Sequence, residues 1–232
     1  FTDVVLGNED LPVYEYLDQI VEAVDTNPVT ICVGETGSGK STQIAQRFLQ
    51  RGYKVVLTQP RRLAAEMLAK RISDEISAPD KLGSGARMLV GFQTAEKNTI
   101  TDDTRLSVVT DGLRLVQELG VFDRDKQDDQ PEVLIIDEVH ERNVNIDVLI
   151  AWTQKRISEG ANLRVVFTTA SINAEKLARH YDKVGAYPPI IEVPGRTHEI
   201  ERLERPESTV AEEAARYARQ GKSVLTFLPG LS

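Results

Sequence analysis

A glycine-rich stretch with one lysine carries the clearest chemistry in the sequence. Residues 33–42 read VGETGSGKST, in which Gly34, Gly39, Lys40 and Ser41 fit the spacing G-x-x-x-x-G-K-[ST]. Glycines let successive amide N–H groups point into one concavity, and the positive N-terminus of a following helix favours an anion there. Lys40 adds a charge for the β- and γ-phosphates, and the Ser41 hydroxyl is the oxygen ligand that Mg²⁺ prefers. The stretch therefore predicts a phosphate-binding loop for a magnesium-bound nucleotide.

Two adjacent carboxylates supply the second part of such a site. Asp137 and Glu138 follow an apolar run in the segment VLIIDEVH. Asp137 is expected to reach the metal through a water, and Glu138 is the predicted general base that deprotonates the attacking water. The alternative, a surface turn that happens to carry two acids, is weakened by the phosphate-binding loop in the same chain. Together the two motifs predict a nucleoside triphosphatase.

Alternating strand and helix patterns must position both motifs. The expected strands cover residues 29–33, 53–60, 86–93, 105–110, 132–137, 163–170 and 189–194. The expected helices cover residues 11–24, 41–52, 64–76, 111–120, 145–157 and 173–181. Several of these strands are apolar on both faces, as a parallel sheet covered by helices requires. The predicted fold is a doubly wound α/β domain with a mainly parallel sheet, whose strand ends bring distant loops to one edge.

The pattern changes after Gly195. Residues 198–207 are charged and read as extended, residues 208–221 read as a helix, and residues 222–230 read as one more strand. We therefore expect one domain over residues 1–195. Residues 196–232 are expected to begin a second, truncated α/β domain.

Composition limits the classes of protein and partner. The chain has 232 residues, 41% of them hydrophobic, and a formal net charge of −8, which argues against binding through one broad basic face. No apolar run approaches the roughly 20 residues of a membrane span, and no secretory signal opens the sequence. A single cysteine and three scattered histidines provide neither a disulfide nor a zinc spacing. We expect a reducing compartment, cytoplasm or nucleus, and only local nucleic-acid contacts, such as Arg61 and Arg62.

Five separated segments resemble, in the same order, the motifs of DEAH-box RNA helicases of superfamily 2. They read GETGSGKST, TQPRRLAA, TDGLRLVQEL, DEVHER and FTTAS. Two later segments, VPGRTHEIE and VLTFLPG, are similar to the crossing into the second RecA-like domain and to the start of its fourth motif. The resemblance covers essentially the whole chain. It implies a RecA-like P-loop fold for the first domain and a fragment of a second RecA-like domain.

The resemblance also implies roles for residues around the nucleotide. His140 joins Lys40, Asp137 and Glu138 in the catalytic set, and Ser41 and Asp137 hold the metal. Arg71 matches an arginine that stacks on the nucleotide base, although an ordinary charge on a helix face is an open alternative. The nucleotide-binding motif itself comprises Gly34, Glu35, Thr36, Gly37, Ser38, Gly39, Lys40, Ser41 and Thr42.

Contacts to RNA and their coupling to hydrolysis are implied in the same way. Arg61, Arg62 and Thr110 match residues that touch the backbone of single-stranded RNA, whereas plain solvation of the two arginines stays an open alternative. Thr169 and Ser171 match the third motif, which couples hydrolysis to strand movement. This motif usually reads Ser-Ala-Thr and here reads Thr-Ala-Ser. Both hydroxyls are kept, but the side-chain methyl group is on the first residue instead of the third. Val139 replaces the usual alanine of the signature, a small change beside the carboxylates.

The resemblance implies an ATP-dependent RNA helicase core that binds Mg²⁺-ATP and single-stranded RNA, with other nucleoside triphosphates accepted and DNA left open. Such proteins have activating protein cofactors; we expect no membrane contact and a monomeric fragment. The fifth and sixth motifs do not occur up to Ser232, so poor hydrolysis is expected. The rival hypothesis is a nucleotide-switched binding module with little hydrolysis, which Glu138 disfavours because a switch needs no base. A GTPase is disfavoured because its base-reading motif is not apparent.

Overall fold

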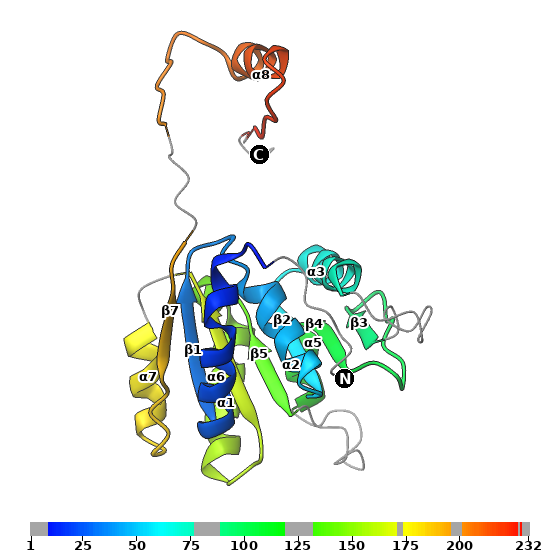
Figure 1. The fold of residues 1–232 in the computed structure, drawn as a ribbon, viewed down its shortest axis with the longest axis vertical. Helices are drawn as coiled ribbons and strands as arrows, with labels where there is room; N and C mark the ends of the chain where they lie inside the picture. The colour runs from blue at the N-terminus through cyan, green and yellow to red at the C-terminus, as the bar shows by residue number, and fades with distance from the viewer. Residues whose placement is uncertain are drawn as a thin grey trace. The chain divides into compact units, whose positions relative to one another are not determined.

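The strands of the first unit form one parallel sheet. The computed structural model describes residues 9–76, 89–118, 132–170, 174–195, 201–226 and 228, and the chain divides into the compact units Phe1–Arg196 and Thr197–Ser232. Across the described residues the sheet has seven strands in the order β3-β4-β2-β5-β6-β1-β7 (Figure 1). The strands are β1 Val29–Gly34, β2 Val55–Gln59, β3 Val90–Gln93, β4 Leu106–Thr110, β5 Val133–Ile136, β6 Arg164–Thr169 and β7 Ile190–Val193.

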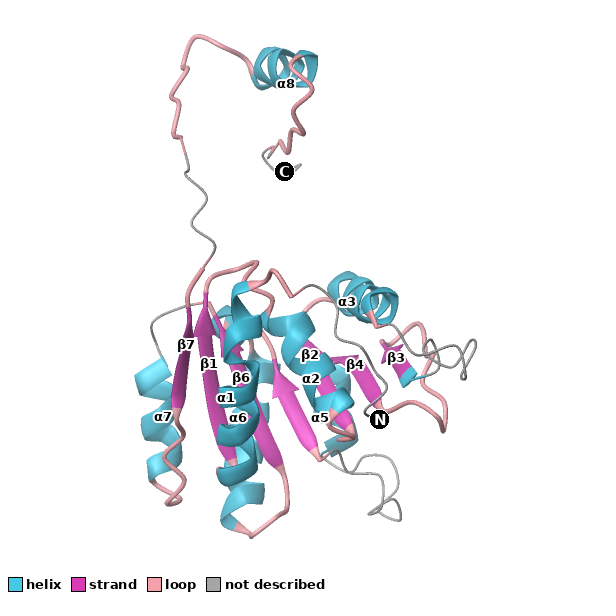
Figure 2. Ribbon diagram, in the orientation of Figure 1, coloured by secondary structure: helices cyan, strands magenta, loops and turns pink. Residues whose placement is uncertain are grey.

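Parallel pairing brings the carboxyl ends of neighbouring strands to one edge. In the register, Val33 of β1 lies opposite Thr169 of β6, and Thr58 of β2 lies opposite Ile136 of β5. Figure 2 shows the arrowheads pointing to the same edge. The loops that follow β1, β2 and β5 therefore start at the same edge of the sheet, although they are distant in sequence.

Helices cover both faces of the sheet, as a doubly wound fold requires (Figure 1). One face carries α1 (Leu17–Thr26), α2 (Ala45–Gln50) and α3 (Arg62–Glu75), and the other carries α5 (Asp111–Glu118), α6 (Val144–Ser158) and α7 (Ala174–Asp182). The predicted α/β class with a parallel sheet is confirmed. None of the helices in the described ranges is long and apolar enough to cross a bilayer.

Each face has its own hydrophobic core. On one side the apolar stripe of α1, at helical spacing, is fully buried together with Phe48 and Leu57. On the other side Phe167 and Tyr181 fill the space between β6 and α7, and the Tyr181 hydroxyl lies 2.7 Å from Thr153 Oγ1. The two cores hold the sheet, and with it the loops at its carboxyl edge, in a fixed frame.

Two predicted helices begin differently from the expectation. The pattern over residues 11–24 opens as the 3-10 helix η1 (Pro12–Tyr16) before α1, because Pro12 suits the first turn of a helix. The helix expected over residues 41–52 opens as one π-helical turn, η2 (Lys40–Ile44), before α2. The π turn therefore places Lys40 and Ser41 on a local irregularity of the kind often found at functional sites.

The second unit contains one helix, α8 (Val210–Arg219), within its described residues. A capping box starts it: the Thr209 hydroxyl accepts from the Glu212 amide, and the Glu212 carboxylate accepts from the Thr209 amide. The strand predicted over residues 222–230 is wrong for residues 222–226, which are not in a strand. A strand needs a hydrogen-bonded neighbour, and the described part of this unit offers none. That this unit begins another RecA-like domain stays a prediction.

Candidate active site

The phosphate-binding loop connects β1 to η2 at the carboxyl edge of the sheet. Gly37 and Gly39 have φ of 87° and 93°, in the left-handed region where side chains are strained. A Cβ atom on Gly34 would lie 2.7 Å from the carbonyl oxygen of Val193, so only glycine fits between β1 and β7 there. The predicted glycine positions thus correspond to backbone conformations that strain other residues, or to close approaches that leave no room for a Cβ atom.

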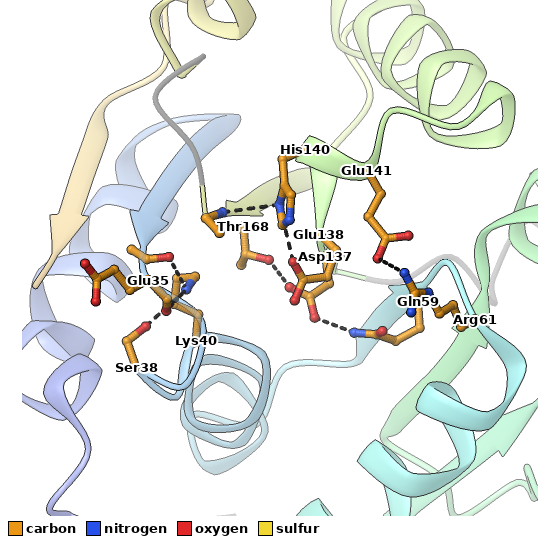
Figure 3. Close-up of polar contacts among 12 residues, drawn as sticks. Glu35, Ser38, Lys40, Gln59, Arg61, Asp137, Glu138, His140, Glu141 and Thr168 are labelled. Atoms are coloured by element: carbon orange, nitrogen blue, oxygen red, sulfur yellow. Dashed lines mark hydrogen bonds and ion pairs between the residues drawn. The ribbon is translucent and has the colours of Figure 1, made fainter. Parts of the chain in front are cut away.

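Lys40 points into the interior of this loop. Its ammonium donates to three acceptors of the loop: the Gly34 carbonyl at 2.6 Å, the Glu35 carbonyl at 2.8 Å and Ser38 Oγ at 3.1 Å (Figure 3). Burial lowers the pKa of Lys40, and the negative charges of Asp137 and Glu138 oppose that shift. The loop therefore carries its cation on the inside, within the electrostatic field of both carboxylates.

Asp137 follows β5 and is 1% exposed. Thr168 Oγ1 donates to Oδ1 and Gln59 Nε2 donates to Oδ2, so neighbouring strands fix the carboxylate on both sides (Figure 3). Burial raises the pKa of Asp137, and hydrogen bonding from Ser41 and Thr168 opposes the rise. Ser41 belongs to the phosphate-binding loop, which follows β1, and β6 pairs with both β1 and β5, so the loop and the carboxylate lie at the same edge of the sheet.

Glu138 and His140 occupy the turn that follows. Glu138 has φ of 54°, a left-handed conformation uncommon outside glycine, and precedes the 3-10 helix η5 (Val139–Glu141). Its Oε2 lies 3.3 Å from His140 Nδ1, and the amide of Ala170 donates to the same nitrogen at 3.3 Å. Burial, then the charge of Asp137, raises the pKa of Glu138. Strain that persists at such a residue is typical of a functional turn.

The oxygen atoms of this site suit a magnesium ion that is shared with phosphates. No group of three or more His, Cys, Asp or Glu in the described ranges could hold a metal by itself. Ser41 and Asp137 provide a hydroxyl and a carboxylate beside an anion-binding loop, and hydrogen bonding from Ser41 opposes the rise that burial causes in the pKa of Asp137. Mg²⁺ is typically bound by one or two protein oxygens together with substrate phosphates and waters. The residues present fit that pattern.

The residues expected to contact RNA lie at the same edge. Arg61 precedes the first residue of α3, and its Nη2 lies 3.1 Å from Glu141 Oε1. Arg62 pairs with Glu96, and the side chains of both arginines are largely exposed. Thr110 ends β4, in register with Gln59 at the end of β2. The adjacent strands β4, β2, β5, β6 and β1 therefore each end in, or lead into, a candidate site residue.

Three predicted residues remain: Thr169, Ser171 and Arg71. Thr169 ends β6 between the phosphate-binding loop and the carboxylates and is 5% exposed. Ser171 lies outside the described residues. Arg71 lies on α3, where its Nε donates to Glu75 Oε1 at 2.8 Å across one helical turn. Glu75 also accepts from Gln43 of η2, so Arg71 is linked to the segment that follows the loop.

Sequence reasoning missed three polar partners of the site: Gln59, Thr168 and Glu141. Gln59 and Thr168 lie at the ends of buried strands and hold Asp137, and Glu141 pairs with Arg61. The sequence held one signal for the first two. A polar residue at the end of an otherwise apolar strand needs a hydrogen-bond partner at the edge of the sheet. The identity of each partner depends on strand order, which a single sequence does not give.

Comparisons with known proteins agree with this geometry. The family model described as "DEAD/DEAH box helicase" matches residues 15–180, which include the phosphate-binding loop and both carboxylates.

Three similar proteins are all named as helicases. The chain is 36% identical over 210 residues to ATP-dependent RNA helicase HrpA of Escherichia coli, covering 89% of the chain and 15% of that protein. It is 35% identical over 244 residues to the probable ATP-dependent RNA helicase DHR2 of Saccharomyces cerevisiae, covering 99% of the chain and 31% of that protein. An HrpA homologue of Haemophilus influenzae is 34% identical over 203 residues, covering 85% of the chain and 14% of that protein. The chain thus spans less than a third of the length of these relatives.

Proposed function

The chain belongs to the DEAD/DEAH box helicase family, and from this premise we propose that it is the nucleotide-binding core of an ATP-dependent RNA helicase. All three relatives named above carry the name ATP-dependent RNA helicase, one of them as probable and one as a homologue, and the chain aligns with a minor part of each. The activity, the RNA substrate and any activating protein partner are therefore parts of the proposal. We also propose that the protein acts in the cytoplasm or nucleus, where RNA and ATP are both present.

The observation that carries the proposal is the convergence of two distant motifs. Lys40 and Ser41 come from the loop after β1, and Asp137 comes from the end of β5. β1 and β5 both pair in parallel with β6, so their carboxyl ends lie at one edge of the sheet, where burial raises the pKa of Asp137 and hydrogen bonding from Ser41 and the charge of Lys40 oppose that rise. This is the arrangement that a magnesium-bound triphosphate needs, with a cation for the phosphates and oxygens for the metal.

In this proposal, four residues of the site each have one part in hydrolysis. Lys40 binds the β- and γ-phosphates, and the amides of the loop supply further donors. Ser41 and Asp137 hold Mg²⁺, which when bound neutralises charge on the phosphate oxygens. Glu138 orients the attacking water and takes its proton, and the nearby charge of Asp137 and burial make it a stronger base than an exposed glutamate.

RNA is bound through its backbone in this proposal. Arg61, Arg62 and Thr110 lie at the ends of β2 and β4 and contact phosphates, so sequence preference is slight. Few contacts predict a shallow salt dependence, with log affinity falling by roughly 0.7 per phosphate contact for each unit of log salt. DNA is a substrate to be tested alongside RNA.

The test combines binding and turnover in the longest form of the protein that carries this chain. We expect ATP hydrolysis that poly-U stimulates, loss of nucleotide binding in Lys40→Ala, and normal binding with turnover lowered roughly 10²- to 10⁴-fold in Glu138→Gln. The rival function, a nucleotide-switched binding module, predicts instead that Glu138→Gln leaves the slow turnover unchanged. Turnover that is indifferent to RNA in the wild-type protein would count against the helicase proposal.

A further inference from the structure

Two contacts join the segment after β2 to the segment after β5. Gln59 Nε2 donates to Asp137 Oδ2, and Arg61 Nη2 donates to Glu141 Oε1 at 3.1 Å (Figure 3). Gln59 and Arg61 are two residues apart, with Pro60 between them. The segment expected to touch RNA is therefore bonded at one end to the metal-binding carboxylate and at the other end to the helix η5 beside the general base.

The contact between Gln59 and Asp137 is buried. Gln59 is 6% exposed and Asp137 is 1% exposed, so neither group exchanges its partner for water at low cost. Thr168 already donates to the other carboxylate oxygen. A carboxylate that is held from both sides has one orientation, and the amide of Gln59 is one of the two groups that set it.

Pro60 makes the link between Gln59 and Arg61 stiff. The proline ring fixes its own φ, and its steric bulk restricts the preceding residue, Gln59, to extended conformations. Between the two residues, only ψ of Pro60 and φ of Arg61 are left to absorb a backbone shift of Arg61 toward a phosphate. The remainder of the shift is passed to the backbone of Gln59 and, through its side chain, to Asp137.

We infer that Gln59 is a positioning residue that couples RNA binding at Arg61 to the orientation of the Asp137 carboxylate and thereby to binding of Mg²⁺-nucleotide. The inference rests on the proposed function, because it takes Arg61 as an RNA contact and Asp137 as a metal ligand. It adds a route between the two ligands that does not pass through Thr169 or the third motif. By thermodynamic reciprocity, RNA must then change nucleotide affinity by the same factor as nucleotide changes RNA affinity.

The test is a binding cycle, which needs no turnover. The dissociation constant of fluorescein-labelled oligouridine is measured by anisotropy with and without Mg²⁺ and a non-hydrolysable ATP analogue. For the wild-type chain the two constants should differ by roughly 5- to 150-fold, the usual range of coupling between sites. The larger of these two dissociation constants divided by the smaller is the coupling ratio. Gln59→Met keeps the side-chain length and removes the hydrogen-bond donor, so the coupling ratio should fall to about one third of its wild-type value or lower. The dissociation constant of RNA without nucleotide should change less than about twofold.

Two further variants make the result decisive. Gln59→Glu places a second carboxylate against Asp137 and should also reduce the coupling ratio. If thermal unfolding shows that Gln59→Met is not folded, the result for Gln59→Glu tests the inference in its place. Gln154→Met is the matched control, because Gln154 also uses its amide in a partly buried contact, to the His180 carbonyl, away from the site. Its ratio should equal that of the wild-type chain.

The outcomes separate the inference from the proposed function. A wild-type ratio near one, or a wild-type ratio preserved in the Gln59 variants, overturns the inference and leaves the proposed function standing. A wild-type chain that binds neither oligouridine nor nucleotide overturns the proposed function itself.

Discussion

Oε2 of Glu138 lies 3.3 Å from Nδ1 of His140. The same nitrogen accepts the amide of Ala170 at 3.3 Å, and one imidazole nitrogen cannot donate to the first and accept from the second at once. Protonation at Nδ1 favours the bond to Glu138, and a bare Nδ1 favours the bond to Ala170. The histidine thus connects the predicted general base to the backbone that follows β6.

Replacing His140 should move the acidic limb of the pH–rate profile. The proposed mechanism needs ionised Glu138, whose pKa lies above its ordinary value of 4.5 because of burial and the charge of Asp137, so the rate should fall as pH drops through that raised pKa. His140 lowers this pKa, and His140→Asn should therefore shift the limb of kcat/KM to still higher pH. His180→Asn, on α7, is the control; an unchanged or downward shift in the His140 variant contradicts the assignment.

Releasing Arg61 from Glu141 should strengthen RNA binding. In the proposed mode of RNA binding, Glu141 competes with phosphate for the guanidinium, and because Arg61 is mostly exposed the pair is worth at most about 1 kcal/mol. Glu141→Gln should lower the dissociation constant of labelled oligouridine by roughly two- to fivefold at low salt. Glu159→Gln changes the net charge equally at an exposed pair on α6 and should have a smaller effect. Equal effects of the two variants would show that only net charge matters.

Asp137→Asn should stabilise the chain in buffer without metal or nucleotide. Burial raises the folded-state pKa of Asp137 above the ordinary 3.8, so the folded state binds more protons than the unfolded state at pH values between the two. The free energy of unfolding therefore falls as pH rises from about 4 through the folded-state pKa, and the loss persists at neutral pH. The asparagine side chain does not ionise, so this loss of stability is absent from the variant. Its melting temperature should be higher than that of the wild-type chain at pH 7 and should depend less on pH. Asp102→Asn, at an exposed position, should change neither; a lower melting temperature for Asp137→Asn would refute the prediction.

The glycines of the phosphate-binding loop should differ in their tolerance of alanine. A Cβ on Gly37 meets nothing within 4 Å, so Gly37→Ala adds only the strain of a positive φ, about 1 kcal/mol. A Cβ on Gly39 would lie 2.9 Å from Leu11 and 3.0 Å from Val13, which adds overpacking of about 1 to 3 kcal/mol. Chemical denaturation should therefore rank Gly39→Ala well below Gly37→Ala in stability. Gly160→Ala, with φ of 76° and open space, measures the strain alone, and a Gly39 variant no worse than this control would be contrary to the structure.

Much of the fold was predictable because its signals are local. The strand leading to Gly34 is apolar, the glycine spacing is short, and Pro60 marks the end of β2, so each element follows from a few neighbouring residues. The bonds of Asp137 were not predictable, since Gln59 and Thr168 reach it only through the strand order β2-β5-β6. The strand expected to begin at Lys222 was predicted wrongly for residues 222–226. A pattern rich in β-forming residues forms no strand where the described residues offer no strand to pair with.

The place of β6 between β1 and β5 also offers a way to observe the site. Thr168 lies opposite Cys32, in the strand that enters the phosphate-binding loop, while its hydroxyl bonds Asp137. Thr168 therefore lies next to both halves of the site, paired with the strand that enters the loop and bonded to the carboxylate. A single ¹³C label there would give one NMR resonance whose shift follows ligand arrival from either side.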